Sequence, residues 1–239
     1  MKKIFIFISF LTCLYWNTLA QGNLSQGIIA HWSFNSPLSF AVCEEISGEQ
    51  DTILGYSKLM EGVNGNCLKL DGYTSKIVHE DFRLNSSTGG FSIEVWVALQ
   101  SLPWNWSAIV NQGLDSCESA KMHGQLKHNF FFGVNALGQL GLHLNNGEKR
   151  IECLSSKKLS LLKWNHIAAT YNGTNLIRLY INGQLAGEQN FYGNFNANCS
   201  SDLWLGMNFE KLGPMGSERK ASENILSDMV IHGLLDEIN

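Results

Sequence analysis

The sequence has little proline, little charge and no apolar run long enough for a comfortable membrane span. Proline accounts for 3 of the 239 residues and charged residues for 16%, below the roughly one quarter that is usual in soluble domains. The net charge is −4 and no run of Lys and Arg exceeds two residues. Nucleic-acid binding requires a basic surface, so we expect no nucleic acid among the partners.

Cysteine is also scarce, and its spacing excludes one common use. No two cysteines form a CxxC pair, which argues against a zinc ribbon. Five follow the first 20 residues: Cys43, Cys67, Cys117, Cys153 and Cys199. The odd count leaves at least one thiol unpaired or paired outside the chain. Alternation within NCLKLDG turns Cys67 inward, as a small buried hydrophobic residue.

The N-terminus has the layout of a secretory signal peptide. MKK supplies the positive charge, IFIFISFLTCLYW the apolar stretch and Thr18-Leu19-Ala20 the small residues before a cleavage site. We expect residues 1–20 to be removed, so that the mature chain begins at Gln21. The apolar stretch is too short for a transmembrane helix of roughly 20 residues, and the residues before Cys13 fit a lipoprotein anchor poorly. The predicted location is secreted, periplasmic or at the cell surface.

The rest of the chain follows a two-residue period. In 90–99, Phe91, Ile93, Val95 and Val97 alternate with other residues, as in a half-buried strand. GIIAHWSFN (27–35), SAIVNQG, HNFFFGVN, GQLGLHLN and RIECLSS have the length and composition of further strands. Only 222–229 is loosely helical. The pattern predicts an all-β fold, an antiparallel two-sheet sandwich.

Asn and Gly mark the turns between these strands. Asn172-Gly173 and Asn182-Gly183 each separate two alternating runs and predict turns of the primed types, which require positive φ. No linker or repeat interrupts 21–239, so we expect one domain. The final residues, HGLLDEIN, form a strand pattern without a following turn. We therefore expect a longer polypeptide, with a further strand and domain after Asn239.

Six segments follow one another along the chain: GIIAHWSFN, GNCLKLDGYTSKIVH, GGFSIEVWV, WNHIAATYNGTNLIRLYINGQLAG, LWLGMN and HGLLDEI. Their order resembles that of the laminin-G-like jelly-roll domains of the concanavalin A-like lectin/glucanase superfamily. They extend over residues 27–238, and the resemblance implies a jelly roll of two packed antiparallel sheets, one of them concave. Residues 209–228 form a longer loop than this family usually has, and its closing strand after Gly233-x-x-Asp236-Glu237 is missing.

Glucanases of the superfamily place carboxylates on alternate residues of one strand, which turns them to the same face. The corresponding strand here has one acid, Glu94. Asp236 and Glu237 are adjacent, so alternation sends them to opposite faces. We expect no catalytic constellation in this chain.

Many members of the family hold a structural Ca²⁺ between the first strand and the Gly-x-x-Asp-Glu segment. The resemblance carries this role onto Asp236 and onto Asn35, a neutral and therefore weaker oxygen ligand. The alternative is that Asp236 caps a turn or forms a pair inside the sandwich.

Loop aromatics beside amides are the candidate carbohydrate-binding residues. Trp104, Asn105 and Trp106 follow a core strand, and Tyr192 belongs to a second aromatic loop, FYGNFNANC. Flat aromatic faces stack on sugar rings, and Asn side chains donate and accept hydrogen bonds. The alternative for each ring is packing against the edge of the core, which we favour for Trp106.

These observations predict a binding module rather than an enzyme. The resemblance implies a carbohydrate-binding or accessory module of a secreted, bacterial polysaccharide-degrading protein such as a glycoside hydrolase. Its expected partners are a polysaccharide or glycan and a catalytic domain downstream in the same chain. The alternatives are an adhesion or protein–protein interaction module and a structural spacer beside a catalytic domain.

Overall fold

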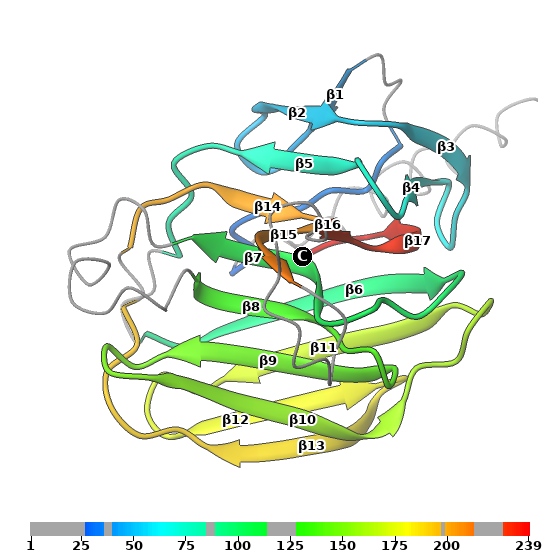
Figure 1. Cartoon of the computed structure of the whole chain (residues 1–239). Coiled ribbons are helices and arrows are strands. Elements are labelled where there is room, and N and C mark those ends of the chain that lie inside the picture. The colour runs from blue at the N-terminus through cyan, green and yellow to red at the C-terminus, as the bar shows by residue number, and fades with distance from the viewer. Residues whose placement is uncertain (1–26, 36–39, 85–88, 114–127, 197–198, 213–226) are drawn as a thin grey trace, which may run out of the picture.

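The computed structural model describes residues 27–35, 40–84, 89–113, 128–196, 199–212 and 227–239. All regular elements in these residues are strands, arranged in two large antiparallel sheets that face each other (Figure 1). The predicted all-β sandwich is confirmed. No helix long and apolar enough to cross a membrane occurs in these parts of the chain.

One sheet has eight strands and the other seven. The eight-stranded sheet consists, in spatial order, of β1 (Ala41–Cys43), β2 (Gln50–Leu54), β5 (Lys76–His79), β14 (Leu203–Leu205), β7 (Ser107–Gly113), β8 (His128–Val134), β9 (Gln139–Asn145) and β10 (Arg150–Lys158). The seven-stranded sheet consists of β13 (Gln184–Asn190), β12 (Leu176–Ile181), β11 (Asn165–Tyr171), β6 (Phe91–Leu99), β17 (His232–Asp236), β4 (Asn66–Asp71) and β3 (Ser57–Glu61). A small sheet of β15 (Met207–Leu212) and β16 (Ser227–Val230) completes the fold.

Strand alternation builds the core as predicted. Phe130 and Phe132 of β8 point into the core between the sheets, where Val95 and Val97 of β6 are also fully buried. Phe131, the residue between the two phenylalanines, packs on the other face of β8 against Trp106 and is also buried. Both faces of β8 are therefore covered, which explains its continuous apolar run.

The two Asn-Gly turns differ. Asn182 has φ 52° and Gly183 φ 75°, the paired positive values of a type I′ turn, so this prediction is confirmed. The prediction is wrong for Asn172-Gly173, where only the glycine has positive φ. The carboxamide oxygen of Asn172 instead accepts bonds from the N–H groups of the next loop residues, Thr174 to Leu176, at 2.9–3.0 Å.

Three other segments depart from the prediction. Residues 27–35 form no continuous strand, and their β-bridge is a single one between Trp32 and Ile238. The loosely helical 222–229 ends in strand β16, with 222–226 outside the described residues. The long loop expected at 209–228 begins and ends in β15 and β16, whose mutual pairing satisfies backbone groups that a loop would expose.

Strand β17 is an interior strand of the seven-stranded sheet. It pairs with β4 on one side and with β6 on the other (Figure 1). Beyond it, Asn239 exchanges two backbone hydrogen bonds of 2.9 Å with Glu94. The strand predicted from HGLLDEIN is thus confirmed and is paired on both edges. A further strand and domain after Asn239 stay a prediction.

The cysteines in the described residues are of two kinds. Cys43, Cys67 and Cys153 are free, whereas Cys199 is disulfide-bonded. Cys67 is fully buried in β4, as alternation predicts. Burial, reinforced by the charge of Asp236, raises the pKa of Cys67 to about 11, so this thiol stays protonated and unreactive at neutral pH.

A buried ion pair beside Trp32 makes stability depend on pH. The His79 ring lies 2.9 Å from Asp51, whose other oxygen accepts a 2.6 Å bond from the Trp32 indole. The hydrogen bond to Asp51 raises the pKa of His79, outweighing burial. A raised pKa stabilises the fold below the unfolded value of about 6.5 and loses that contribution as pH rises through the folded value.

We therefore expect His79→Gln to destabilise the domain by about 1–2 kcal/mol more at pH 5.5 than at pH 8.5. Thermal denaturation at both pH values measures this difference. His143→Gln is the matched control, since burial lowers the pKa of His143 and its pH dependence has the opposite sign. An equal loss at both pH values for His79→Gln would contradict the prediction.

Candidate functional site

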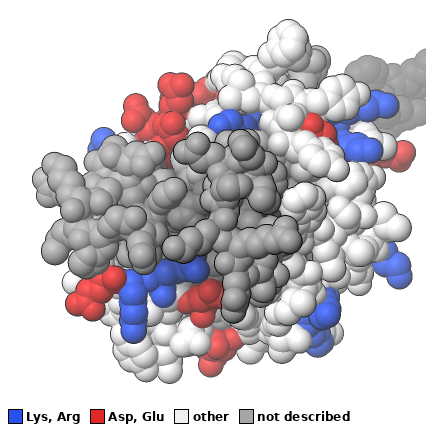
Figure 2. All heavy atoms as spheres, viewed as in Figure 1, with Lys and Arg blue, Asp and Glu red and all other residues white. Residues whose placement is uncertain are grey.

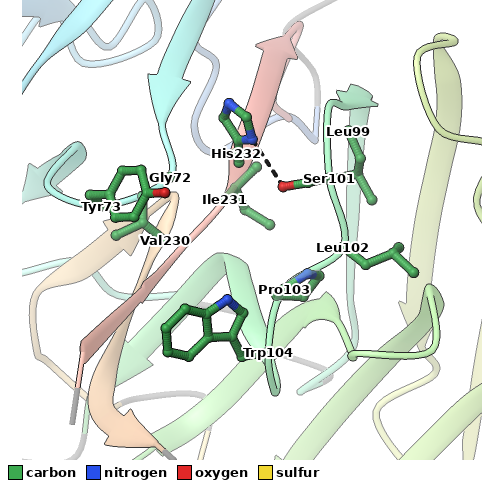
Figure 3. Close-up of a pocket in the computed structure, with 10 residues that line it drawn as sticks. All are labelled: Gly72, Tyr73, Leu99, Ser101, Leu102, Pro103, Trp104, Val230, Ile231 and His232. Atoms are coloured by element: carbon green, nitrogen blue, oxygen red, sulfur yellow. Dashed lines mark hydrogen bonds between the residues drawn. The ribbon is translucent and has the colours of Figure 1, made fainter. Parts of the chain in front are cut away.

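A pocket opens at one end of the sandwich, where loops from both sheets meet. It has a volume of about 130 Å³. The β4–β5 turn, the β6–β7 loop and the start of β17 form its walls (Figure 3). Ten residues line it: Gly72, Tyr73, Leu99, Ser101, Leu102, Pro103, Trp104, Val230, Ile231 and His232. None of these ten is Asp, Glu, Lys or Arg.

Two large aromatic side chains at this pocket are exposed to solvent. Trp104 is 58% exposed and Tyr73 is 74% exposed. Figure 3 shows the two rings on the pocket wall, one from the β6–β7 loop and one from the β4–β5 turn. The apolar surface of such rings is in contact with water in the free protein and is buried when a ligand covers it. This favours binding and makes the pocket the candidate binding surface.

The sequence around Tyr73 fixes its turn. The carboxylate of Asp71 accepts hydrogen bonds from the backbone N–H groups of Tyr73 and Thr74, both at 2.8 Å, and of Ser75 at 3.1 Å. Burial alone would raise the pKa of Asp71, but these bonds outweigh it and lower the pKa far below its usual value. Gly72 has φ 81°, and a Cβ there would lie 2.7 Å from the His232 Cβ. Only glycine allows the turn to pack this closely on β17.

The polar groups of the pocket come from Ser101 and His232. The Ser101 hydroxyl lies 2.9 Å from Nδ1 of His232 (Figure 3). His232 is the first residue of β17, and its carbonyl accepts a 2.8 Å bond from Gln100 N–H. The strand pairing therefore holds both polar side chains in place, where a hydroxyl and an imidazole can hydrogen-bond to sugar hydroxyl groups.

Of the three neighbouring residues predicted for sugar binding, only Trp104 presents its ring to solvent. The Trp106 ring is half-buried and packs edge-on against His143 at 4.4 Å and against Phe131 at 5.7 Å. The Asn105 side chain accepts a 2.7 Å bond from the N–H of Trp106. Packing is therefore the role of Trp106, and Asn105 shapes the turn that separates the two rings.

Tyr192 is exposed but lies far from Trp104. It follows β13, at the end of the sheet where β6 begins with Phe91, whereas Trp104 follows the other end of β6. Tyr192 is 67% exposed, and its carbonyl accepts a 2.7 Å bond from Asn146. The structure therefore does not bring Tyr192 into one site with Trp104.

The acidic residues considered for hydrolysis have other partners. Glu94 is exposed and lies 3.6 Å from His166. The prediction that Asp236 and Glu237 face opposite sides is wrong, because Glu237 has φ 49° and breaks the alternation. Asp236 accepts a bond from the Asn64 backbone and Glu237 one from the Asn64 side chain.

Asp236 and Asn35, the predicted calcium ligands, both hold the turn at 62–66. Oδ2 of Asp236 accepts bonds from Val63 N–H at 2.7 Å and Asn64 N–H at 3.2 Å. Asn35 accepts a 2.7 Å bond from Asn66 N–H and donates to the Asn64 carbonyl at 3.2 Å. The turn-capping alternative for Asp236 is therefore observed.

One oxygen at this turn remains available to a cation. Oδ1 of Asp236 is buried and has no hydrogen-bond partner. Burial raises the pKa of Asp236, against the two bonds on Oδ2, and the charge of Glu237 adds to the rise. Asp236 thus fits a calcium ligand, whereas both amide atoms of Asn35 are engaged. No group of three His, Cys, Asp or Glu suited to a metal occurs in the described residues.

A laminin-G-type model of the concanavalin A-like lectin/glucanases superfamily matches residues 71–217. The chain belongs to this superfamily. The matched region begins at Asp71, immediately before the turn that carries Tyr73, and includes the loop of Trp104. The comparison of this chain with curated proteins found no match.

Several solved structures share the fold at low identity. Domain 4 of AbnA, a GH43 extracellular arabinanase from Geobacillus stearothermophilus, in complex with arabinotriose, is 18% identical with a TM-score of 0.62, over 87% of this chain and 89% of that one. A Trypanosoma rangeli sialidase is 14% identical (TM-score 0.57), and the binding domain of Paraclostridial Mosquitocidal Protein 1 is 15% identical (0.59). The sialidase and mosquitocidal-protein matches each cover 89% of this chain, but 30% of the sialidase and 48% of the mosquitocidal-protein structure. The shared feature is the sandwich.

Sequence reasoning missed Tyr73 and His232 of this superfamily member. Tyr73 stands among Gly, Thr and Ser in DGYTS, and a large aromatic in a short turn between two strands is a signal for an exposed ring. His232 gives no such signal, because it reads as an ordinary strand residue. Its place at the pocket follows from the pairing of β17 with β6, which is a long-range feature of the topology.

Proposed function

We propose that this domain is a non-catalytic carbohydrate-binding module and that the pocket at Tyr73 and Trp104 is its glycan-binding site. The observation that carries the proposal is the pair of exposed rings at a pocket with a hydroxyl and an imidazole in its wall. This is the combination that sugars require, because their CH faces stack on aromatic rings and their hydroxyl groups need donors and acceptors.

The fold supports an accessory role. The arabinanase AbnA contains a domain with this architecture, solved in complex with arabinotriose. The proposed setting is therefore a secreted polysaccharide-degrading protein, such as a glycoside hydrolase, with the catalytic domain elsewhere in its chain. The disulfide at Cys199 supports export, since disulfides persist in oxidising compartments. Figure 2 shows basic residues scattered among acidic ones on the described surface in view, without the basic patch that nucleic-acid binding would need.

Trp104→Ala tests the site. We expect this substitution to weaken the affinity for the polysaccharide that the parent domain binds by about 30-fold, or about 2 kcal/mol. This is the loss typical of a central aromatic residue in an interface. Affinity electrophoresis in gels that contain arabinan or fructan measures this change. Tyr192→Ala is the matched control, since it removes an equally exposed ring at the other end of the sandwich. Unchanged retention of Trp104→Ala would exclude the pocket, and no retention of the parent by any polysaccharide would favour a protein-binding module.

We also propose that Ca²⁺ binds at Asp236, through the partnerless Oδ1 and not through the Asn35 side chain. A bound cation would offset the buried negative charge and so stabilise the folded state. At a free calcium concentration 100 times the dissociation constant, this stabilisation is about 2.7 kcal/mol.

Chelation tests the calcium proposal. We expect EDTA to lower the melting temperature of the parent domain, and added calcium to restore it. Asp236→Asn, which keeps an acceptor for the turn but loses the charge, should melt at the same temperature with and without chelator. A parent melting temperature that ignores EDTA would refute the proposal.

A further inference from the structure

A third exposed aromatic residue lies directly beside the pocket. Tyr56 is 71% exposed and connects β2 of the eight-stranded sheet to β3 of the seven-stranded sheet. Neither composition nor strand pattern draws attention to it, and it is absent from the pocket lining. Its position follows from the pairing of β2 with β5 and of β3 with β4, which brings the β2–β3 turn to the β4–β5 turn.

The two turns are joined by hydrogen bonds. The N–H of Tyr56 donates to the Thr74 hydroxyl at 3.1 Å, and the Tyr56 carbonyl accepts a bond from the Ser75 hydroxyl. Gly55, with φ 79°, packs so closely that a Cβ would lie 2.1 Å from the Thr74 carbonyl oxygen. Tyr56 and Tyr73 therefore project from one rigid double turn. Rings held in this way lose little conformational entropy when a ligand covers them.

The charge of the pocket lining bears on the class of sugar that can bind. None of the ten residues that line the pocket is Asp, Glu, Lys or Arg. Asp71, the nearest acid in the turn, directs its carboxylate to the turn itself and accepts bonds from the backbone N–H groups of Tyr73, Thr74 and Ser75. A uronate or sialate would find no Lys or Arg in the pocket lining with which to pair, whereas a neutral sugar needs only rings and hydrogen-bonding groups.

From these contacts we propose that the ligand is a neutral oligosaccharide several units long, with Tyr56 as a further binding residue. One end of the oligosaccharide occupies the pocket beside Trp104, and the following sugar units pass over Tyr73 to Tyr56. This inference rests on the proposed function, because it assumes that the pocket binds glycan. It adds the charge class of the glycan, its minimum extent and a contact outside the pocket.

A length series tests the proposal. The probes are linear arabino-oligosaccharides and fructo-oligosaccharides of two to eight units, titrated by isothermal calorimetry into the full chain. The expected result is an affinity that rises with length and then levels off. Tyr56→Ala should bind the disaccharide as the parent does, within about twofold, and the longest probe about 10-fold more weakly. This is the change expected from one stacked ring.

Three variants separate the possible outcomes. Trp104→Ala should lose affinity at every length, Tyr56→Phe should keep the parent's length dependence, and Tyr192→Ala should behave as the parent. If Trp104→Ala weakens binding but Tyr56→Ala has no effect at any length, the extension is wrong and the proposed function stands. If neither probe series binds, or Trp104→Ala has no effect, both are wrong. Tighter binding of polygalacturonate, reversed by 0.5 M NaCl, would overturn the neutral ligand class.

Discussion

Replacing Phe132 with alanine is expected to lower the free energy of unfolding by about 3–5 kcal/mol. Phe132 is fully buried at the centre of β8, in the core between the sheets. Its removal leaves a cavity that neither sheet can close, because β8 is held by β7 on one side and by β9 on the other. Domains of this size have a total stability of roughly 5–15 kcal/mol, so the loss is a large part of it.

Urea denaturation followed by tryptophan fluorescence measures the change in Phe132→Ala. Leu185→Ala is the matched control, since Leu185 is also a strand residue but is 54% exposed. That control should stay within about 0.5 kcal/mol of the parent. A loss below 1 kcal/mol for Phe132→Ala would show that the two sheets do not share the core described above.

Gly233→Ala is expected to be nearly as damaging, at about 3 kcal/mol. Gly233 pairs with Leu70 of β4 and with Leu99 of β6. A Cβ at this position would lie 2.5 Å from the Ala98 carbonyl oxygen and 3.0 Å from the Leu99 Cα. Both contacts are with backbone, so relief requires the strands to separate. This explains physically why glycine opens the Gly-x-x-Asp-Glu segment.

The same denaturation experiment tests Gly233→Ala, with Gly183→Ala as its control. Gly183 has φ 75° and open space where a Cβ would be. Its substitution should therefore cost only the conformational penalty of about 1–2 kcal/mol for a left-handed residue. Equal losses for the two variants would mean that the strands around Gly233 can move apart more easily than their pairing indicates.

The fold was largely predictable because alternation is a local signal. From Phe91 to Val97, every second residue is apolar, which predicts one buried face. The strand that this alternation predicts is β6. The errors lie where a tertiary contact overrides local pattern. The segment around Trp32 has the alternation of a strand, yet it forms only one β-bridge, between Trp32 and Ile238. The end of the segment that suggests a helix, residues 227–229, is in β16, because β15 provides a partner strand.

The candidate site was only partly predictable. Trp104 could be found because it follows a strand and stands beside Pro103 and Asn105 in a loop. Whether a loop ring faces water or the fold depends on its neighbours in space, which is why Trp106 packs on Phe131 and His143 and Trp104 does not. Tyr73 and Tyr56 reach the site through strand pairing, which no local pattern encodes.

The central place of β17 has a consequence for how the protein is made. Of the strands described, β17 is the last to leave the ribosome, yet β4 and β6 both depend on it for their hydrogen bonds. Until it emerges, the edges of β4 and β6 that pair with β17 have unpaired backbone N–H and C=O groups, which can pair with other chains. The strands of this sheet can therefore complete their pairing only after β17 has emerged.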